Sequence, residues 1–178
     1  MTVDKIYLVG FMASGKSTVA RHLATRLRWR WEDIDHLIEV REKSTVAEIF
    51  AKHGEAYFRT AEREMLALLR PLRHIIVATG GGTFTDPDNR AAINMDGASV
   101  WIDVPLAELI SRIPLDGRRP LAADRPALER LYLARTEAYR MAHLRVNASR
   151  SSAAVVADRI IEALHAFPPT IGVPFEEP

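Results

Sequence analysis

Residues 10–17 determine most of what can be predicted about this chain. They read Gly-Phe-Met-Ala-Ser-Gly-Lys-Ser, which fits the pattern G-x-x-x-x-G-K-[ST] of a phosphate-binding loop, or P-loop. Its glycines let consecutive backbone N–H groups point at a polyphosphate, Lys16 adds a positive charge, and the Ser17 hydroxyl can bind Mg²⁺. An apolar run, Ile6–Val9, precedes the loop, and residues with helical periodicity follow it, up to Leu27. That order favours a site for ATP or GTP over a Gly/Ser turn that binds nothing.

Apolar runs alternate with helical stretches along the chain, a pattern typical of a parallel α/β sheet. Strands are expected at Ile6–Val9, Trp29–Glu32, Ile75–Ala78, Ser99–Asp103 and Arg145–Asn147. Helices are expected at 17–27, 46–69 with a break near Gly54, 89–95, 106–112, 125–142 and 153–164. Right-handed crossovers between such units leave few topologies. The predicted fold is therefore a three-layer α/β/α sandwich with a central five-stranded parallel sheet.

Composition and charge limit the partners that the chain can have. The 178 residues are 48% hydrophobic and 26% charged, with a formal net charge of +1 and no cysteine. This balance gives no reason to expect a nucleic-acid or membrane partner, and the lack of cysteine is compatible with a reducing cytosol. The chain enters a strand within a few residues, and no apolar run approaches the roughly 20 residues that span a bilayer. We expect a cytoplasmic monomer without a signal peptide.

One domain is expected to occupy residues 1–166. Residues 114–126 contain three prolines, a glycine and alternating charges, which predicts a mobile surface loop. Residues 167–178 are rich in proline, which favours an extended or disordered tail.

Two aspartates follow the P-loop helix, in Trp31-Glu32-Asp33-Ile34-Asp35. On an extended strand, Asp33 and Asp35 would point to the same face, at the edge of the sheet where phosphates lie in this kind of fold. One carboxylate could then hold Mg²⁺ through water, and the other could accept a proton or bind a substrate hydroxyl. The alternative is that Asp35 caps a following helix. The nearby P-loop favours the functional interpretation.

Three glycines, Gly80–Gly82, come directly after the apolar run Ile75–Ala78. Glycines at the end of a strand let a ligand approach the backbone, whose N–H groups can bind a hydroxyl or carboxylate. The alternative is a flexible turn. Thr79 stands where many P-loop proteins carry a metal-binding acid, so the metal's carboxylate must come from elsewhere, and Asp33 is available.

Several arginines could bind an anionic substrate, because the planar guanidinium matches carboxylate and phosphoryl groups. Arg59 has Glu62 three residues later to orient it, and Arg135 precedes Tyr139 by four residues. Arg118 and Arg119 lie in the proline-rich loop. The alternative for each is an ordinary solvated surface residue.

Taken together, these motifs resemble the shikimate kinase family over about residues 6–164. That family combines a P-loop, a D-x-D strand, an F-R helix start, a strand-terminal G-G-G, an R-P-L lid and an R-x-x-x-Y helix. This chain has them in that order, at Gly10–Ser17, Asp33 with Asp35, Phe58-Arg59, Gly80–Gly82, Arg119-Pro120-Leu121, and Arg135 with Tyr139. The P-loop is shared by many nucleotide-binding proteins, so the set as a whole carries the resemblance.

The resemblance implies an ATP- and Mg²⁺-dependent kinase that phosphorylates the 3-hydroxyl of shikimate, a step of aromatic amino acid biosynthesis. Lys16 and Ser17 would bind the ATP phosphates and Mg²⁺, with Asp33 reaching the metal. Arg119, on a lid over about residues 113–126, would neutralise charge on the transferred phosphoryl group. The implied nucleotide contacts are Ala13, Ser14, Gly15, Lys16, Ser17, Thr18, Arg112, Arg119 and Arg150.

On the acceptor side, the resemblance implies that Asp35 holds the shikimate hydroxyls and acts as the base for the attacking 3-hydroxyl. Arg59 and Arg135 would bind the shikimate carboxylate, assisted by the backbone N–H groups of Gly80, Gly81 and Gly82. Phe50 and Phe58 would line the ring of the substrate.

Several positions depart from the family's usual pattern. Ala13 replaces a common P-loop glycine, which is tolerable if its φ stays negative, and Arg28 stands where a helix-capping glycine is common. Ser151-Ser152 occupies a turn that usually contains a proline beside the adenine. Two other functions stay open at this point: a related kinase for another small carboxylate-bearing polyol such as gluconate, and a catalytically silent nucleotide-binding module.

Overall fold

Five parallel strands form the centre of the molecule in a computed structural model that describes residues 3–113 and 125–166. The strands are β1 (Lys5–Val9), β2 (Arg30–Asp33), β3 (Ile75–Ala78), β4 (Ala98–Asp103) and β5 (Leu144–Asn147). The α-helices are α1 (Lys16–Leu27), α2 (Ile34–Glu42), α3 (Val46–Leu69), α4 (Pro87–Asp96), α5 (Leu106–Arg112), α6 (Arg125–Tyr139) and α7 (Ala153–His165), and Thr83–Thr85 form a short 3₁₀ helix, η1. The predicted tail, and most of the predicted lid with Arg118 and Arg119, lie outside the described residues.

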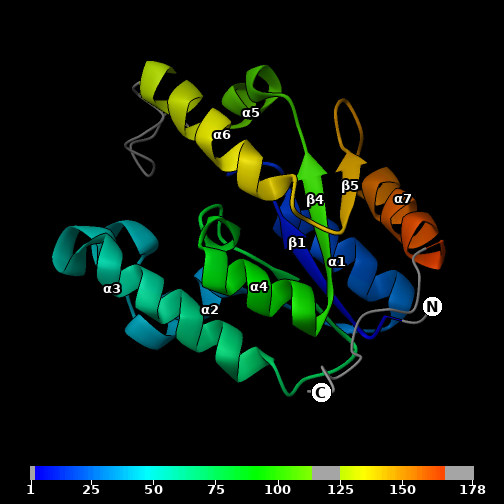
Figure 1. Ribbon diagram of the computed structural model, residues 1–178, viewed down its shortest axis with the longest axis horizontal. Coiled ribbons are helices and arrows are strands. Elements are labelled where there is room, and N and C mark those ends of the chain that lie inside the picture. The colour runs from blue at the N-terminus through cyan, green and yellow to red at the C-terminus, as the bar shows by residue number, and fades with distance from the viewer. Residues whose placement is uncertain (1–2, 114–124, 167–178) are drawn as a thin grey trace, which may run out of the picture.

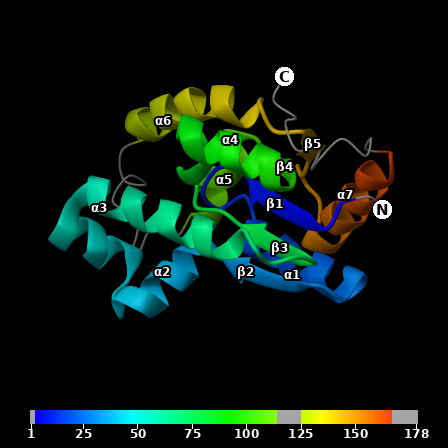
Figure 2. The same cartoon turned by 60° about the horizontal axis from the view of Figure 1, so that its bottom comes forward.

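The strand order is β2-β3-β1-β4-β5, and helices cover both faces of the sheet, as Figures 1 and 2 show. Helices α1 and α7 pack against each other on one face, and α4 and α6 lie on the other (Figure 2). Strands buried on both faces are mainly apolar, and every residue of β1 and β3 is buried, including Lys5. The predicted three-layer sandwich with five parallel strands is confirmed.

The carboxyl ends of β1, β2 and β3 meet at one edge of the sheet, because all the strands run in the same direction. The P-loop follows β1, α2 follows β2, and the glycines follow β3. Three segments far apart in the sequence therefore lie side by side.

The prediction that Asp33 and Asp35 share a strand face is wrong. Strand β2 is Arg30–Asp33 instead of Trp29–Glu32, and Asp33 is the N-cap of α2, where its side chain accepts a hydrogen bond from the backbone N–H of His36 at 3.3 Å. Asp35 lies in the first turn of α2. Aspartate at an N-cap satisfies helix N–H groups that have no partner within the helix, which ends the strand two residues earlier than a shared face requires.

Helix α3 is interrupted at Gly54, as predicted, with φ 79° and ψ 175°. Thr45 and Glu48 form the capping box at its start. Within the described residues, no helix combines the length and the apolar surface that crossing a membrane would require.

A buried ion pair lies at the start of β1, at the end of the strand opposite the P-loop. Lys5, fully buried in β1, donates to Asp96 at 2.6 Å and to the carbonyls of Leu69 and Arg70 at 2.9 Å each. Tyr7 donates to the same Asp96 carboxylate at 2.5 Å. The end of α3, the end of α4 and β1 are thereby held together.

Asp96→Ala should lower the free energy of unfolding by about 3 kcal/mol, because it leaves the charge of Lys5 buried without its carboxylate. Denaturant unfolding measures this loss. Asp158→Ala is the control, since it removes a surface ion pair with Arg26 and should cost less than about 1 kcal/mol. Equal, small losses in the two variants would show that Asp96 is not needed to balance Lys5.

Candidate active site

The P-loop curls around its own lysine at the start of α1. Gly10 has φ 141°, and a Cβ there would lie 2.8 Å from the carbonyl oxygen of Ile102, so only glycine fits. Lys16 is 91% buried, and its Nζ donates to the carbonyls of Gly10 and Phe11 at 2.9 Å each. Ser14 is buried in the same loop. The loop therefore holds an ammonium group beside the N-terminus of α1, where the backbone dipole also favours an anion.

The condition under which Ala13 would be tolerable, a negative φ, is not met: its φ is 61°, in the left-handed region. This left-handed conformation is the reason why a glycine is common at this position of a P-loop. Alanine can adopt it at a cost of about 1 kcal/mol. Arg28 has the same conformation, with φ 55°, at the C-cap of α1, where a helix commonly ends in glycine.

Two oxygen donors meet beside the loop. The Ser17 hydroxyl donates to Oδ2 of Asp33, and this hydrogen bond joins α1 to the end of β2. A hydroxyl and a carboxylate suit Mg²⁺, which is usually held by one or two protein oxygens and completed by water and phosphate. No group of three or more metal-binding side chains occurs in the described part of the chain, as this mode of binding allows. The residues present therefore fit Mg²⁺.

Asp35 reaches the glycine turn after β3. A Cβ on Gly80 would lie 2.5 Å from Oδ1 of Asp35 and 2.8 Å from Oε1 of Glu62, so any larger residue there would displace these carboxylates. The structure thus brings Asp35 to Gly80, as the sequence predicts, although α2 and not a strand positions it.

Arg59 and Arg135 lie against the same turn from two helices. A Cβ on Gly82 would overlap the guanidinium of Arg59, and one on Gly81 would lie 3.2 Å from Nη1 of Arg135. Arg59 comes from α3 and Arg135 from α6, 76 residues apart in the sequence. The predicted pair of arginines therefore converges on the glycines.

Carboxylates fix Arg59 but not Arg135. Arg59 donates to buried Glu62 at 2.6 Å and to Glu55 at 2.9 Å. Burial by itself would lower the pKa of Arg59, but these two carboxylates outweigh it, and the pKa is raised. No carboxylate within the described residues forms an ion pair with Arg135, and burial lowers its pKa. A site with one such arginine favours an anionic ligand.

The sequence predicts that Glu62 orients Arg59, but it does not indicate three other residues that support the turn or Arg59. Thr83 donates to Glu62 at 2.5 Å, Tyr139 donates to the carbonyl of Gly81, and Glu55 lies one helical turn before Arg59. Only the spacing of Glu55 could have been noticed in the sequence. Phe50 and Phe58, expected to line the substrate, have ring centroids 4.8 Å apart, and the Cζ of Arg59 lies 5.8 Å from the Phe58 ring.

Arg112 and Arg150 lie together at another part of this edge. Arg112 ends α5, and Arg150 follows β5 in a turn with φ 50°. Both contact Glu108: the Arg112 side chain donates to it, as does the backbone N–H of Arg150 at 3.1 Å. The sequence does not indicate this shared partner. Arg119 lies outside the described residues.

The sequence profile described as shikimate kinase matches residues 12–165. The chain belongs to the shikimate kinase family. A shikimate kinase of Sulfurihydrogenibium is 37% identical over 160 residues, covering 89% of this chain and 96% of that protein. A shikimate kinase of Synechococcus is 40% identical over 163 residues, covering 89% and 83%.

Solved structures agree with this assignment. The shikimate kinase of Acinetobacter baumannii in complex with shikimate is 34% identical, with a TM-score of 0.86 over 93% of this chain and 94% of that one. The deoxyadenosine kinase of M. mycoides with bound dATP, 18% identical with a TM-score of 0.63, shares the fold. This member of the shikimate kinase family is thus an enzyme that phosphorylates shikimate with ATP, and neither a gluconate-type kinase nor a silent module is favoured.

Proposed function

We propose that this kinase transfers the γ-phosphoryl group of ATP to the 3-hydroxyl of shikimate at the carboxyl ends of β1, β2 and β3. One observation carries the proposal: Asp35, Arg59 and Arg135 converge on the glycine turn after β3, next to the P-loop after β1. A carboxylate beside two guanidinium groups can bind an alcohol that also bears a carboxylate. This arrangement supports an acceptor site beside a donor site.

On the donor side, the proposed phosphate contacts are the loop from Ala13 to Gly15 and the start of α1. Backbone N–H groups at the N-terminus of α1 would bind the phosphates, and Lys16 would add the positive charge. Ser17 and Asp33 would hold Mg²⁺, which neutralises charge on the phosphates when it is bound. Thr18, the next residue of the same turn, would also contact the nucleotide.

On the acceptor side, Arg59 and Arg135 would bind the shikimate carboxylate and orient the ring. The backbone N–H groups of Gly80–Gly82 would assist them, and Phe50 and Phe58 would exclude water from the ring. Asp35 would accept the proton of the 3-hydroxyl. The hydroxyl oxygen would form a bond to the γ-phosphorus while the bond between the γ-phosphorus and the ADP oxygen breaks. Such a reaction depends mainly on positioning and charge neutralisation.

The remaining assignments rest on the resemblance. Arg119 would neutralise the transferred phosphoryl group, and Arg112 and Arg150 would contact the nucleotide. We also propose that the enzyme acts in the cytoplasm as a monomer, with ATP and shikimate as its substrates.

Arg59→Ala should raise the KM for shikimate about 10- to 100-fold and change the KM for ATP little, because it removes a charged contact to the acceptor alone. Steady-state kinetics with each substrate varied in turn measures both constants. Arg63→Ala is a matched control, since Arg63 lies one turn further along α3 and pairs with Asp86. An unchanged KM for shikimate in Arg59→Ala would show that the acceptor lies elsewhere.

A further inference from the structure

A single carboxylate joins the two arginines expected at the nucleotide. Glu108, in the first turn of α5, accepts from the side chain of Arg112 one helical turn later. It also accepts from the backbone N–H of Arg150, at 3.1 and 3.2 Å to its two oxygens, and from the Ser149 hydroxyl at 3.1 Å. Both oxygens of Glu108 are therefore bound to donors from α5 and from the turn after β5.

That turn has a conformation that needs support. Arg150 has φ 50°, in the left-handed region that costs a residue with a Cβ about 1 kcal/mol. A charge-assisted hydrogen bond to its backbone N–H can offset this cost. The hydrogen bond from Arg150 is also the largest of the effects that lower the pKa of Glu108, so the group is bound in its ionised form.

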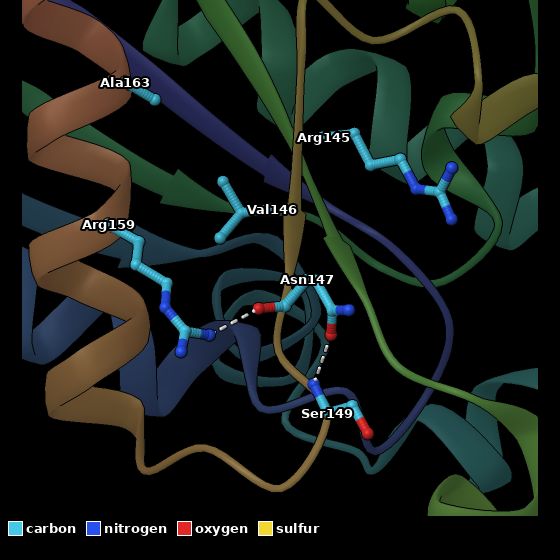
Figure 3. Close-up of a pocket in the computed structure, with 6 residues that line it drawn as sticks. All are labelled: Arg145, Val146, Asn147, Ser149, Arg159 and Ala163. Atoms are coloured by element: carbon cyan, nitrogen blue, oxygen red, sulfur yellow. Dashed lines mark hydrogen bonds between the residues drawn. The ribbon is translucent and has the colours of Figure 1, made fainter.

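Arg159 holds the same turn from the other side. Its guanidinium donates to the carbonyl of Asn147 at 2.8 Å and to the Ser151 hydroxyl at 2.9 Å, from α7 across an open hollow of about 510 Å³ beside β5 (Figure 3). Figure 3 also shows the Asn147 side chain accepting from the backbone N–H of Ser149, at 2.9 Å. The turn is thus fixed by an anion from α5 and by a cation from α7.

We infer that Glu108 is a positioning residue of the nucleotide site, which sets Arg112 and the turn at Ser149-Arg150 in the arrangement that receives ATP. This inference rests on the proposed nucleotide site. In an ordinary surface ion pair within one helix, Glu108 would contact Arg112 alone. Here the carboxylate also binds two groups of a segment 41 and 42 residues away. Side-chain contacts from both α5 and α7 thus position this turn.

Titration of ADP into the complete protein tests the inference. Glu108→Ala should raise the Kd for ADP and the KM for ATP about tenfold, the effect of losing charge-assisted contacts to one group, and leave the KM for shikimate within about twofold. Glu108→Gln keeps the shape and one acceptor oxygen and should restore part of the affinity. If Glu108→Ala does not fold, Glu108→Gln against the wild type carries the test.

Glu137→Ala is the control, because it removes an exposed ion pair with Arg140 on α6 and should leave both constants unchanged. A lower melting temperature for Glu108→Ala with an unchanged Kd for ADP would overturn the inference, since it would show a structural role only. The ADP titration does not require turnover. A wild-type protein that binds ADP without phosphorylating shikimate would therefore refute the proposed function and leave the role of Glu108 to be judged by its own Kd.

Discussion

Replacing Lys16 with methionine should lower kcat at least about 10³-fold. The variant keeps an unbranched stem in the space beside Gly10 and Phe11 but loses the ammonium group. A preorganised charge at the transferred phosphoryl group acts in a site with little water, and removing such a donor costs several powers of ten. Single-turnover measurement of ADP and phosphorylated product gives the chemical rate directly.

The same lysine also donates to two carbonyls of its own loop, so its loss could disturb the fold of the loop. Lys16→Arg keeps a charge and controls for this effect: its melting temperature should match that of Lys16→Met, and its activity should be higher. A Lys16→Met variant that retains more than a tenth of the wild-type kcat would contradict the donor site.

Asp35→Asn should lower kcat about 10²- to 10⁴-fold, with a change of only a few-fold in the KM for shikimate. The amide can still bind a hydroxyl, but it cannot take the proton. The loss should therefore fall on kcat and not on binding, which distinguishes a base from a binding group. Initial rates over a range of shikimate concentrations separate the two constants.

Asp88→Asn provides a matched control for Asp35→Asn. Each aspartate is the second residue of its helix and follows an aspartate N-cap, Asp33 in one case and Asp86 in the other. Asp88 is exposed on α4. Equal activity in the two variants, within a few-fold of the wild type, would show that Asp35 is not the base.

The sheet could be predicted well from the sequence, because buried parallel strands leave a plain signal. The sequence predicts β3 with its observed bounds, since Ile75–Ala78 is a continuous apolar run that ends at glycines. It also predicts the break of α3 at Gly54, because glycine weakens a helix. Such local patterns do not depend on distant parts of the chain.

The site could be predicted in its residues but not in its support. Asp33 contacts Ser17, and Asp35, Arg59 and Arg135 lie against the glycine turn, although strand periodicity gives the wrong reason for the two aspartates. An aspartate that can continue a strand can also cap a helix, and the choice depends on the contacts around it. The contacts of Glu108 join segments more than 40 residues apart in the chain, so no local pattern indicates them.

The central claim is that Gly10–Ser17 presents ATP to a carboxylate-bearing alcohol held by Asp35, Arg59 and Arg135. The most direct measurement incubates the purified protein with ATP and Mg²⁺, with shikimate, with gluconate, or with no acceptor, and follows ADP and the phosphorylated product by ³¹P NMR. The account predicts ADP and shikimate 3-phosphate in equal amounts with shikimate, and no faster ADP formation with gluconate than with ATP alone. ADP formation with shikimate no faster than with ATP alone would contradict it.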